Sequence, residues 1–289
     1  MKLQMKFNLI LFAVLLIGVV GTSWFSYTIL QKNAQNEILN QANLLMESAL
    51  AVRKYTVEQV KPNLASGDFF LPQSVPAFGA TEVFKTVQEK YPEFSYKEAT
   101  LNPTNPRDQA IGWEVDIVEA FRSDPTGTKE IVGTRKEGGA HSLYMARPIA
   151  ITNPACLACH SRPQNAPPAM IAKYGDKNGF GWQLNEIVGA QIVTVPMNVP
   201  IAKANKAFYI SVASLVGVFI FILIIMNIMM RIIIIKPIKE MSQMADDVSM
   251  GKPQVKEFIP KGNDEVEVLG VSFNRMRRSL EKAMKMLKR

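Results

Sequence analysis

The 289-residue sequence predicts an α+β domain that lies between two membrane-spanning helices and is followed by an all-α helical hairpin. Three observations predict this arrangement. Two long apolar runs cover residues 7–30 and 208–235. Between them, a segment with helical periodicity gives way to short β-rich runs separated by turn residues, as in an α+β domain. After the second run, two stripes of apolar residues repeat at helical spacing.

Each apolar run contains the roughly 20 uncharged residues that a helix needs to cross a bilayer. Arg231 interrupts the second run near its end, where a long side chain can reach the lipid headgroups. The first run could be a cleaved signal peptide. No small-x-small cleavage pattern follows cleanly, however, and Trp24, Phe25 and Tyr27 form an interfacial aromatic belt, so we expect an uncleaved anchor.

Basic residues at the ends of the spans indicate the orientation. Lys2 and Lys6 precede the first span, and Lys236 and Lys239 follow the second. The positive-inside rule therefore places residues 1–6 and 236–289 in the cytoplasm, with Lys203 and Lys206 as a weaker opposing signal. We expect a bacterial inner-membrane protein with two spans, both termini cytoplasmic and residues 31–207 periplasmic.

The periplasmic segment begins with a stretch free of proline, Gln31 to Lys61, which predicts a helix continuing from the first span and ending at Pro62. Its apolar face comprises Ile38, Ala42, Leu45, Ala49, Val52 and Thr56. Three later runs predict strands: Trp113 to Val118, Ser142 to Ile149 and Ile187 to Val195. Turn residues separate them at 102–106, 124–127 and Gly138-Gly139.

The run Cys156-Leu157-Ala158-Cys159-His160 has the spacing of a covalent attachment site for a c-type haem. Each thiol can bind one vinyl group of the porphyrin, and His160 can coordinate the iron. A redox dithiol or a zinc site is the alternative. Zinc would need two more soft ligands, and the chain contains only these two cysteines. We therefore expect one covalent haem c, carried on the connection between the last two predicted strands.

The sequence does not identify the sixth iron ligand. His141 is the only other histidine, and Met46, Met145, Met170 and Met197 are thioether candidates. An open position would leave the iron free to bind nitric oxide, carbon monoxide or oxygen. Arg53, Lys54 and Arg147 are candidate partners for the haem propionates, because a cation suits a carboxylate, and ordinary surface ion pairs are the alternative.

The C-terminal segment predicts two helices joined by an extended connector. Pro237 occupies the first turn of the first helix, whose stripe is Ile238, Met241, Ala245 and Val248 and which ends at Gly251. The connector contains Pro253, Val255, Ile259 and Pro260. The second stripe is Leu269, Phe273, Met276, Leu280, Ala283 and Leu287.

Two resemblances follow from these motifs. The runs Leu143-Tyr144-Met145-Ala146-Arg147-Pro148, Cys156 to His160, Gly179-Phe180-Gly181-Trp182 and Gly189 to Val193 resemble a family of PAS-like extracytoplasmic c-type haem domains, first catalogued as a domain of unknown function and typified by a cyanobacterial haem protein. The resemblance covers residues 40–200 and implies a PAS-like fold with one covalent haem.

The tail resembles a HAMP domain through Pro237, Asp264-Glu265-Val266 and Phe273-Asn274-Arg275-Met276, which implies a homodimeric four-helix bundle that relays signals.

We expect a haem-based sensor that responds to redox state or a diatomic gas and signals across the membrane; the alternative is a membrane-tethered electron carrier. A peroxidase would need a distal acid–base pair beside the haem, and none can be recognised in the sequence. Neither histidine lies in the tail and no nucleotide-binding loop occurs, so we expect a non-enzyme that acts through a separate cytoplasmic partner. The net charge of +8 does not indicate nucleic-acid binding, because Lys282, Lys285, Lys288 and Arg289 form a solvated face near anionic lipid.

Overall fold

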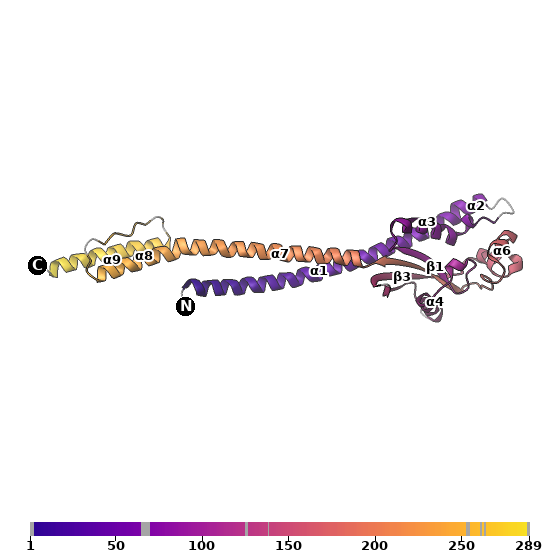
Figure 1. Ribbon diagram of the computed structural model, residues 1–289, viewed down its shortest axis with the longest axis horizontal. Helices are drawn as coiled ribbons and strands as arrows, with labels where there is room; N and C mark the ends of the chain where they lie inside the picture. Colours follow the sequence, from indigo (N-terminus) through magenta and orange to yellow (C-terminus); the bar gives the residue numbers. More distant parts are fainter. Residues whose placement is uncertain are drawn as a thin grey trace. The chain divides into compact units, whose positions relative to one another are not determined.

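The computed structural model describes residues 3–64, 70–124, 127–137, 139–252, 255–260, 262 and 264–287. Lys2, Gly138, Pro253, Lys288, Arg289 and two turn residues at 125–126 lie outside this description. Contacts divide the chain into two compact units, Tyr27–Ala207 on one side and Met1–Ser26 with Phe208–Arg289 on the other. Figure 1 labels most of the α-helices of both units and the strands β1 and β3.

A long helix, α1 (Leu3–Tyr55), belongs in part to each unit and continues as a π-helical turn at Thr56–Val60 and as α2 (Lys61–Leu64). The predicted apolar face is confirmed in its main members, because Ile38, Ala42 and Ala49 are fully buried. We expected the helix to end at Pro62, but it continues to Leu64. Pro62 is the second residue of α2 and directly follows the π-helical turn at Thr56–Val60, where the regular i→i−4 hydrogen-bond pattern is already interrupted.

The sheet in the 27–207 unit has four antiparallel strands in the order β1-β4-β3-β2. They are β1 (Ser95–Thr100), β2 (Ile131–Glu137), β3 (Ala140–Ala150) and β4 (Ile187–Pro196). The two central strands, β3 and β4, are the ones that the sequence predicted. Strands β1 and β2 were not predicted; they form the two edges of the sheet and carry mostly polar residues.

The prediction of a strand at Trp113 to Val118 is wrong: these residues begin α4 (Trp113–Ser123). The buried side chains of α4 include Ile117, Val118 and Phe121, which follow the three-to-four spacing of a helix. The residues from Trp113 to Val118 taken alone also fit the apolar–polar alternation of a strand. Only when Phe121 is included does the helical spacing become distinguishable from that alternation.

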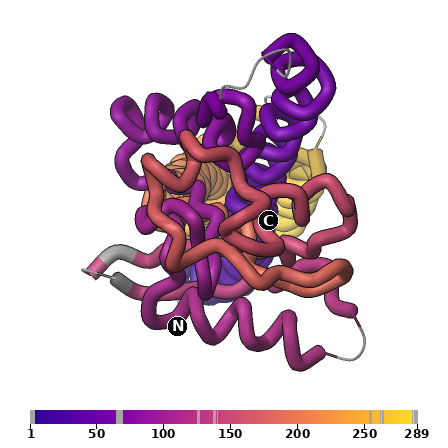
Figure 2. The backbone as a smooth tube through the Cα atoms, turned by 90° about the vertical axis from the view of Figure 1, so that its right-hand side faces the viewer, coloured from indigo at the N-terminus to yellow at the C-terminus, as the bar shows by residue number. Residues whose placement is uncertain are grey.

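The sheet is packed on both faces, because neighbouring residues of one strand enter different cores. Val193 belongs to a cluster with Ile38, Ala42 and Met46 of α1 and with Phe84 of α3 (Pro76–Lys90). Ile192, the adjacent residue, belongs to a second cluster with Val118 and Phe121 of α4. Side chains alternate across a strand, so α1 and α3 cover one face and α4 covers the other (Figure 2).

The other unit contains helices only among its described residues: α7 (Asn198–Met229, shared with the first unit), a π-helical turn at Met230–Ile235, α8 (Lys236–Ser249) and α9 (Glu265–Leu287). Two helical runs, Gln4–Leu64 and Asn198–Ser249, are long and apolar enough to cross a membrane. Asn227 accepts hydrogen bonds from Gln4 (3.2 Å) and Asn8 (2.9 Å), which ties the first apolar segment to the second.

Candidate haem site

The Cys-x-x-Cys-His motif lies on the connection from β3 to β4, as the sequence predicted. Cys156 ends a 3-10 turn (Pro154–Cys156), and Leu157–His160 forms the short helix α5. The side chain of Asn153 accepts a hydrogen bond from the backbone N–H of Ala155 at 2.9 Å, which caps the turn. Helical backbone through the motif places Cys156 and Cys159 about one turn apart on the same face.

A cavity of about 360 Å³ lies over this motif and is lined by Cys156, Cys159 and His160. Its other walls come from the end of α1 and the following turns, from α3, from the segment after β1 and from α6 (Pro168–Tyr174). Lining side chains from these elements include Arg53, Lys61, Phe78, Asp108 and Met170. The cavity is therefore enclosed by segments distant in sequence, which only the folded domain brings together.

His160 is held at one edge and on one face of its ring. Its Nδ1 lies 2.8 Å from the carbonyl oxygen of Gly179 and 3.3 Å from the hydroxyl of Thr104. Trp182 stacks on the imidazole with ring centroids 4.0 Å apart and planes 12° apart. A carbonyl can only accept a hydrogen bond, so Nδ1 carries the proton and Nε2 keeps a free lone pair.

Burial sets the protonation of this histidine. Burial lowers the pKa of His160, and the hydrogen bond to the Gly179 carbonyl opposes this effect only in part. The neutral imidazole is therefore favoured, and this is the form that coordinates a metal. An N–H on the far side of the ring bonded to a carbonyl is also the usual arrangement for a metal-ligating histidine.

The Gly179 segment is fixed to the loop that follows β1. The N–H of Gly179 donates to the side chain of Asn102 (3.0 Å), and the amide of Asn102 donates to the carbonyl of Phe180 (3.1 Å). Gly179 has a φ of +82°, and a Cβ there would lie 2.0 Å from the hydroxyl of Thr104. Only glycine fits this position, because both the backbone conformation and the close approach exclude a side chain.

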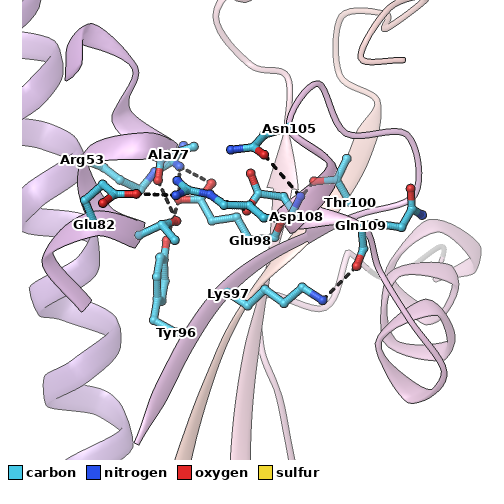
Figure 3. A network of polar contacts seen from close by, with 12 residues as sticks. Arg53, Ala77, Glu82, Tyr96, Lys97, Glu98, Thr100, Asn105, Asp108 and Gln109 are labelled. Atoms are coloured by element: carbon cyan, nitrogen blue, oxygen red, sulfur yellow. Dashed lines mark hydrogen bonds and ion pairs between the residues drawn. The ribbon is translucent and has the colours of Figure 1, made fainter. Parts of the chain in front are cut away.

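A buried acid forms the centre of the polar wall of the cavity. Glu98 is 4% exposed, and its carboxylate accepts hydrogen bonds from Arg53 (Nη1 to Oε1, 2.5 Å) and from the hydroxyl of Tyr96 (2.7 Å). Figure 3 shows both groups directed at Glu98. Burial acts against the charge of Arg53, but Glu98 outweighs it and the pKa of Arg53 is raised. Arg53 therefore lines the cavity as one half of an ion pair.

A second acid lies in the same wall. Burial raises the pKa of Asp108 to about 6; Arg107 and Lys97 oppose this rise, whereas Glu98 adds to it. Arg107 itself forms ion pairs with Glu82 and Asp108. The cavity wall thus contains a carboxyl group that changes its charge near neutral pH.

The structure places several of the candidate residues away from the cavity. His141 is exposed on β3, Met46 and Met145 are buried in the core cluster under α1, and Met197 packs against that cluster. Arg147 forms ion pairs with Glu47 (2.7 Å) and Glu130 (2.9 Å), and Lys54 faces Glu58 in solvent. Met46, His141 and Arg147 therefore do not line the cavity, whereas Met170 and Arg53 do.

Sequence reasoning alone did not find the residues that orient His160. Thr104, Asn102 and the Gly179 carbonyl act through backbone and short polar groups, which carry no motif of their own. Their only signal was the turn-forming composition of residues 102–106 and the Gly-Phe-Gly-Trp run.

The residues present fit a covalent haem. Cys156 and Cys159 are free thiols, partly accessible at the cavity, and His160 presents an unprotonated nitrogen beside them. Among the described residues, no group of three or more His, Cys, Asp or Glu side chains is placed to hold a metal ion. The zinc alternative thus has no ligand set in the part of the chain that the structure describes.

Comparisons with known proteins identify two family domains in the chain. The Tll0287-like family model matches residues 31–196, which is more than half of the chain, and the HAMP domain model matches residues 229–282. No curated protein matches the chain. A solved structure, described as the crystal structure of the cyanobacterial heme-protein Tll0287, aligns with 18% identity and a TM-score of 0.44, covering 55% of this chain and 95% of that one. The chain belongs to the Tll0287-like family and carries a HAMP domain after its second apolar helix.

Proposed function

We propose that this protein is a membrane-bound sensor that holds one covalent haem c and relays the redox or diatomic-gas state of that haem through its HAMP domain. The observation that carries the proposal is the geometry at His160. Its Nδ1–H is bonded to Gly179, and its Nε2 is free at a cavity that two cysteine thiols share. The presence of a HAMP domain in the same chain favours signalling over electron transport alone.

The residues of the site have separate roles in this proposal. The thiols of Cys156 and Cys159 would hold the haem through two thioether bonds, each made by adding S–H across one vinyl C=C, which needs no oxidant. His160 would bind the iron through Nε2, and Gly179, Thr104 and Trp182 fix the plane of its ring. The haem supplies an iron centre that can change oxidation state or bind a gas.

We further propose that residues 7–30 and 208–235 span a bacterial inner membrane, with residues 31–207 in the periplasm and both termini in the cytoplasm. Two helical runs long enough to span support this topology. Lys6 lies before the first run, and Arg231, Lys236 and Lys239 lie at the far end of the second, as the positive-inside rule expects.

The HAMP segment supports a homodimer. Of the predicted apolar stripe on α9, Leu269, Met276 and Leu280 are 54%, 62% and 50% exposed in the single chain, whereas Met241 on α8 is buried. A row of exposed apolar side chains at this spacing is the seam of a helical bundle that lacks its other half. A second copy of the chain would cover it and form a parallel four-helix bundle, a two-state element that can relay a shift of the second span to a cytoplasmic partner.

Two measurements on the full-length chain in detergent test the sensor proposal. Carbon monoxide or nitric oxide should shift the Soret band of the reduced haem if the iron accepts a gas. Met276→Cys, in a chain whose native cysteines are both bound to haem, should form disulfide-linked dimers at different rates in the oxidised, reduced and gas-bound states. A crosslinking rate that is the same in all these states would instead support the alternative, a membrane-tethered electron carrier.

A further inference from the structure

Met170 differs in position from the other methionines of the 27–207 unit. It lies on α6, is 2% exposed and lines the same cavity as Cys156, Cys159 and His160. Met46 and Met145 are buried in the core under α1, and Met197 packs against that core. Met170 is thus the thioether of this unit that can meet a group bound at the cysteine motif.

The short helix that carries Met170 is firmly defined. Pro167 and Pro168 begin it, and Gly175 ends it with a φ of +83° and an N–H that donates to the carbonyl of Ile171 (2.8 Å). The N–H of Met170 donates to the carbonyl of Pro167 at 2.9 Å. A side chain that is buried on such an element has few alternative positions, which suits a ligand that must stay close to one atom.

Other cavity-lining side chains could in principle donate to iron, and each is less suited. The carboxylates of Glu98 and Asp108 already form ion pairs with Arg53 and Arg107. Lys61 is exposed, and its ammonium group must lose a proton before the nitrogen can coordinate. Tyr174 binds iron as a phenolate, and burial raises the pKa of Tyr174, which disfavours that form. A thioether is neutral, needs no deprotonation and tolerates an apolar surrounding.

We propose that the Sδ atom of Met170 is the sixth ligand of the haem iron, completing a His160–Met170 axial pair. The inference rests on the proposed function, since it presupposes a haem at Cys156 and Cys159. It assigns the resting sensor a six-coordinate, low-spin iron whose potential is raised by the thioether. A gas then binds only by displacing Met170, so a redox change is the direct signal and gas binding is a competing one.

The test uses the haem-loaded full-length chain and three variants: Met170→Leu, Met170→His and the control Met197→Leu. Leucine keeps the apolar volume but has no sulfur, and Met197 lies against the core away from the cavity. The readouts are the sulfur-to-iron charge-transfer band of the ferric protein, the methionine methyl resonance shifted by the ring current of the ferrous haem, and the midpoint potential.

Wild type and Met197→Leu should show both methionine signatures. Met170→Leu should lose both, have a lower midpoint potential and bind carbon monoxide faster, and Met170→His should restore a low-spin spectrum with two nitrogen ligands. Methionine signatures that persist in Met170→Leu, or that are missing from the wild type, would overturn the assignment. A chain that carries no covalent haem after denaturation would instead overturn the proposed function, so the two failures are distinguishable.

Discussion

The Nδ1 atom of His160 lies 2.8 Å from the carbonyl oxygen of Gly179, nineteen residues further along the chain. This one contact determines which ring nitrogen carries the proton and therefore which one faces the cavity. It also connects the haem motif to the loop after β1, because the N–H of Gly179 is bonded to Asn102. The imidazole of His160 is thus positioned by the domain and not by the motif alone.

Replacing Gly179 with alanine tests this connection, and Gly181 provides a matched control. Both residues have a positive φ, +82° and +81°, so an alanine at either position is strained by about 1–2 kcal/mol. A Cβ at Gly179 would in addition lie 2.0 Å from Thr104, whereas a Cβ at Gly181 meets nothing within 4 Å. Gly179→Ala should therefore lower the melting temperature of the full chain more than Gly181→Ala and weaken the low-spin haem spectrum. Equal effects of the two changes would contradict the role of this loop.

Loss of one partner from the ion pair between Arg53 and Glu98 should strongly destabilise the folded domain. Glu98→Gln leaves a mostly buried guanidinium without its carboxylate, which costs about 3 kcal/mol in the free energy of unfolding. The exposed pair of Glu47 with Arg147 is the control, because Glu47→Gln should cost about 0–1 kcal/mol. Urea unfolding of the detergent-solubilised chain measures both changes. The double variant Arg53→Met/Glu98→Leu should recover much of the loss, and a larger loss in the double variant would argue against the interpretation.

The pH dependence of the free energy of unfolding should show the titration of the Asp108 carboxyl group. Burial raises its pKa in the folded protein to about 6, above the ordinary value of 3.8, so the folded state binds this proton more tightly than the unfolded state. The stability from this proton is complete below about pH 4 and is lost as the pH rises through about 6. The free energy of unfolding of the wild type should therefore fall relative to Asp108→Asn between these values. Parallel pH profiles of the two proteins would show that Asp108 does not titrate in this range.

The connector of the HAMP segment should depend on Asn274. This buried side chain accepts a hydrogen bond from the N–H of Phe258 (3.0 Å) and donates one to its carbonyl (2.7 Å). Asn274→Leu leaves both backbone groups unpaired, at a cost of about 1–3 kcal/mol. Hydrogen exchange at the Phe258 amide should become faster in this variant and stay unchanged in Arg275→Ala, which alters an exposed neighbour on the same helix. Unchanged exchange in Asn274→Leu would mean that the connector is held by other contacts.

The sequence predicted the parts of the fold whose pattern is strong over a long window. The α1 stripe and the central strands β3 and β4 bury regular sets of apolar residues, and periodicity detects such sets. The strand β1 was not detectable because Lys97 and Glu98 occupy it, and both owe their place to partners elsewhere: Glu114 for Lys97 and Arg53 for Glu98. Long-range ion pairs of this kind leave no local signal.

The same distinction applies to the site. Cys156, Cys159 and His160 are adjacent in sequence and could be recognised from their spacing, whereas Met46, Met145, Met170 and Met197 were indistinguishable as ligand candidates. Only the packing of α1 and α6 separates a core methionine from one at the cavity. A sequence motif predicts the chemistry of its own residues. Which distant side chains lie opposite the motif depends on how the domain folds.

The mass of the denatured full-length chain tests the central claim most directly. Expressed with a c-type haem maturation system, the wild type should carry the added mass of one haem. Cys156→Ser and Cys159→Ser should each lose at least one thioether bond, and the double variant should carry no haem. A wild-type chain at its unmodified mass, with both thiols open to alkylation, would contradict the account.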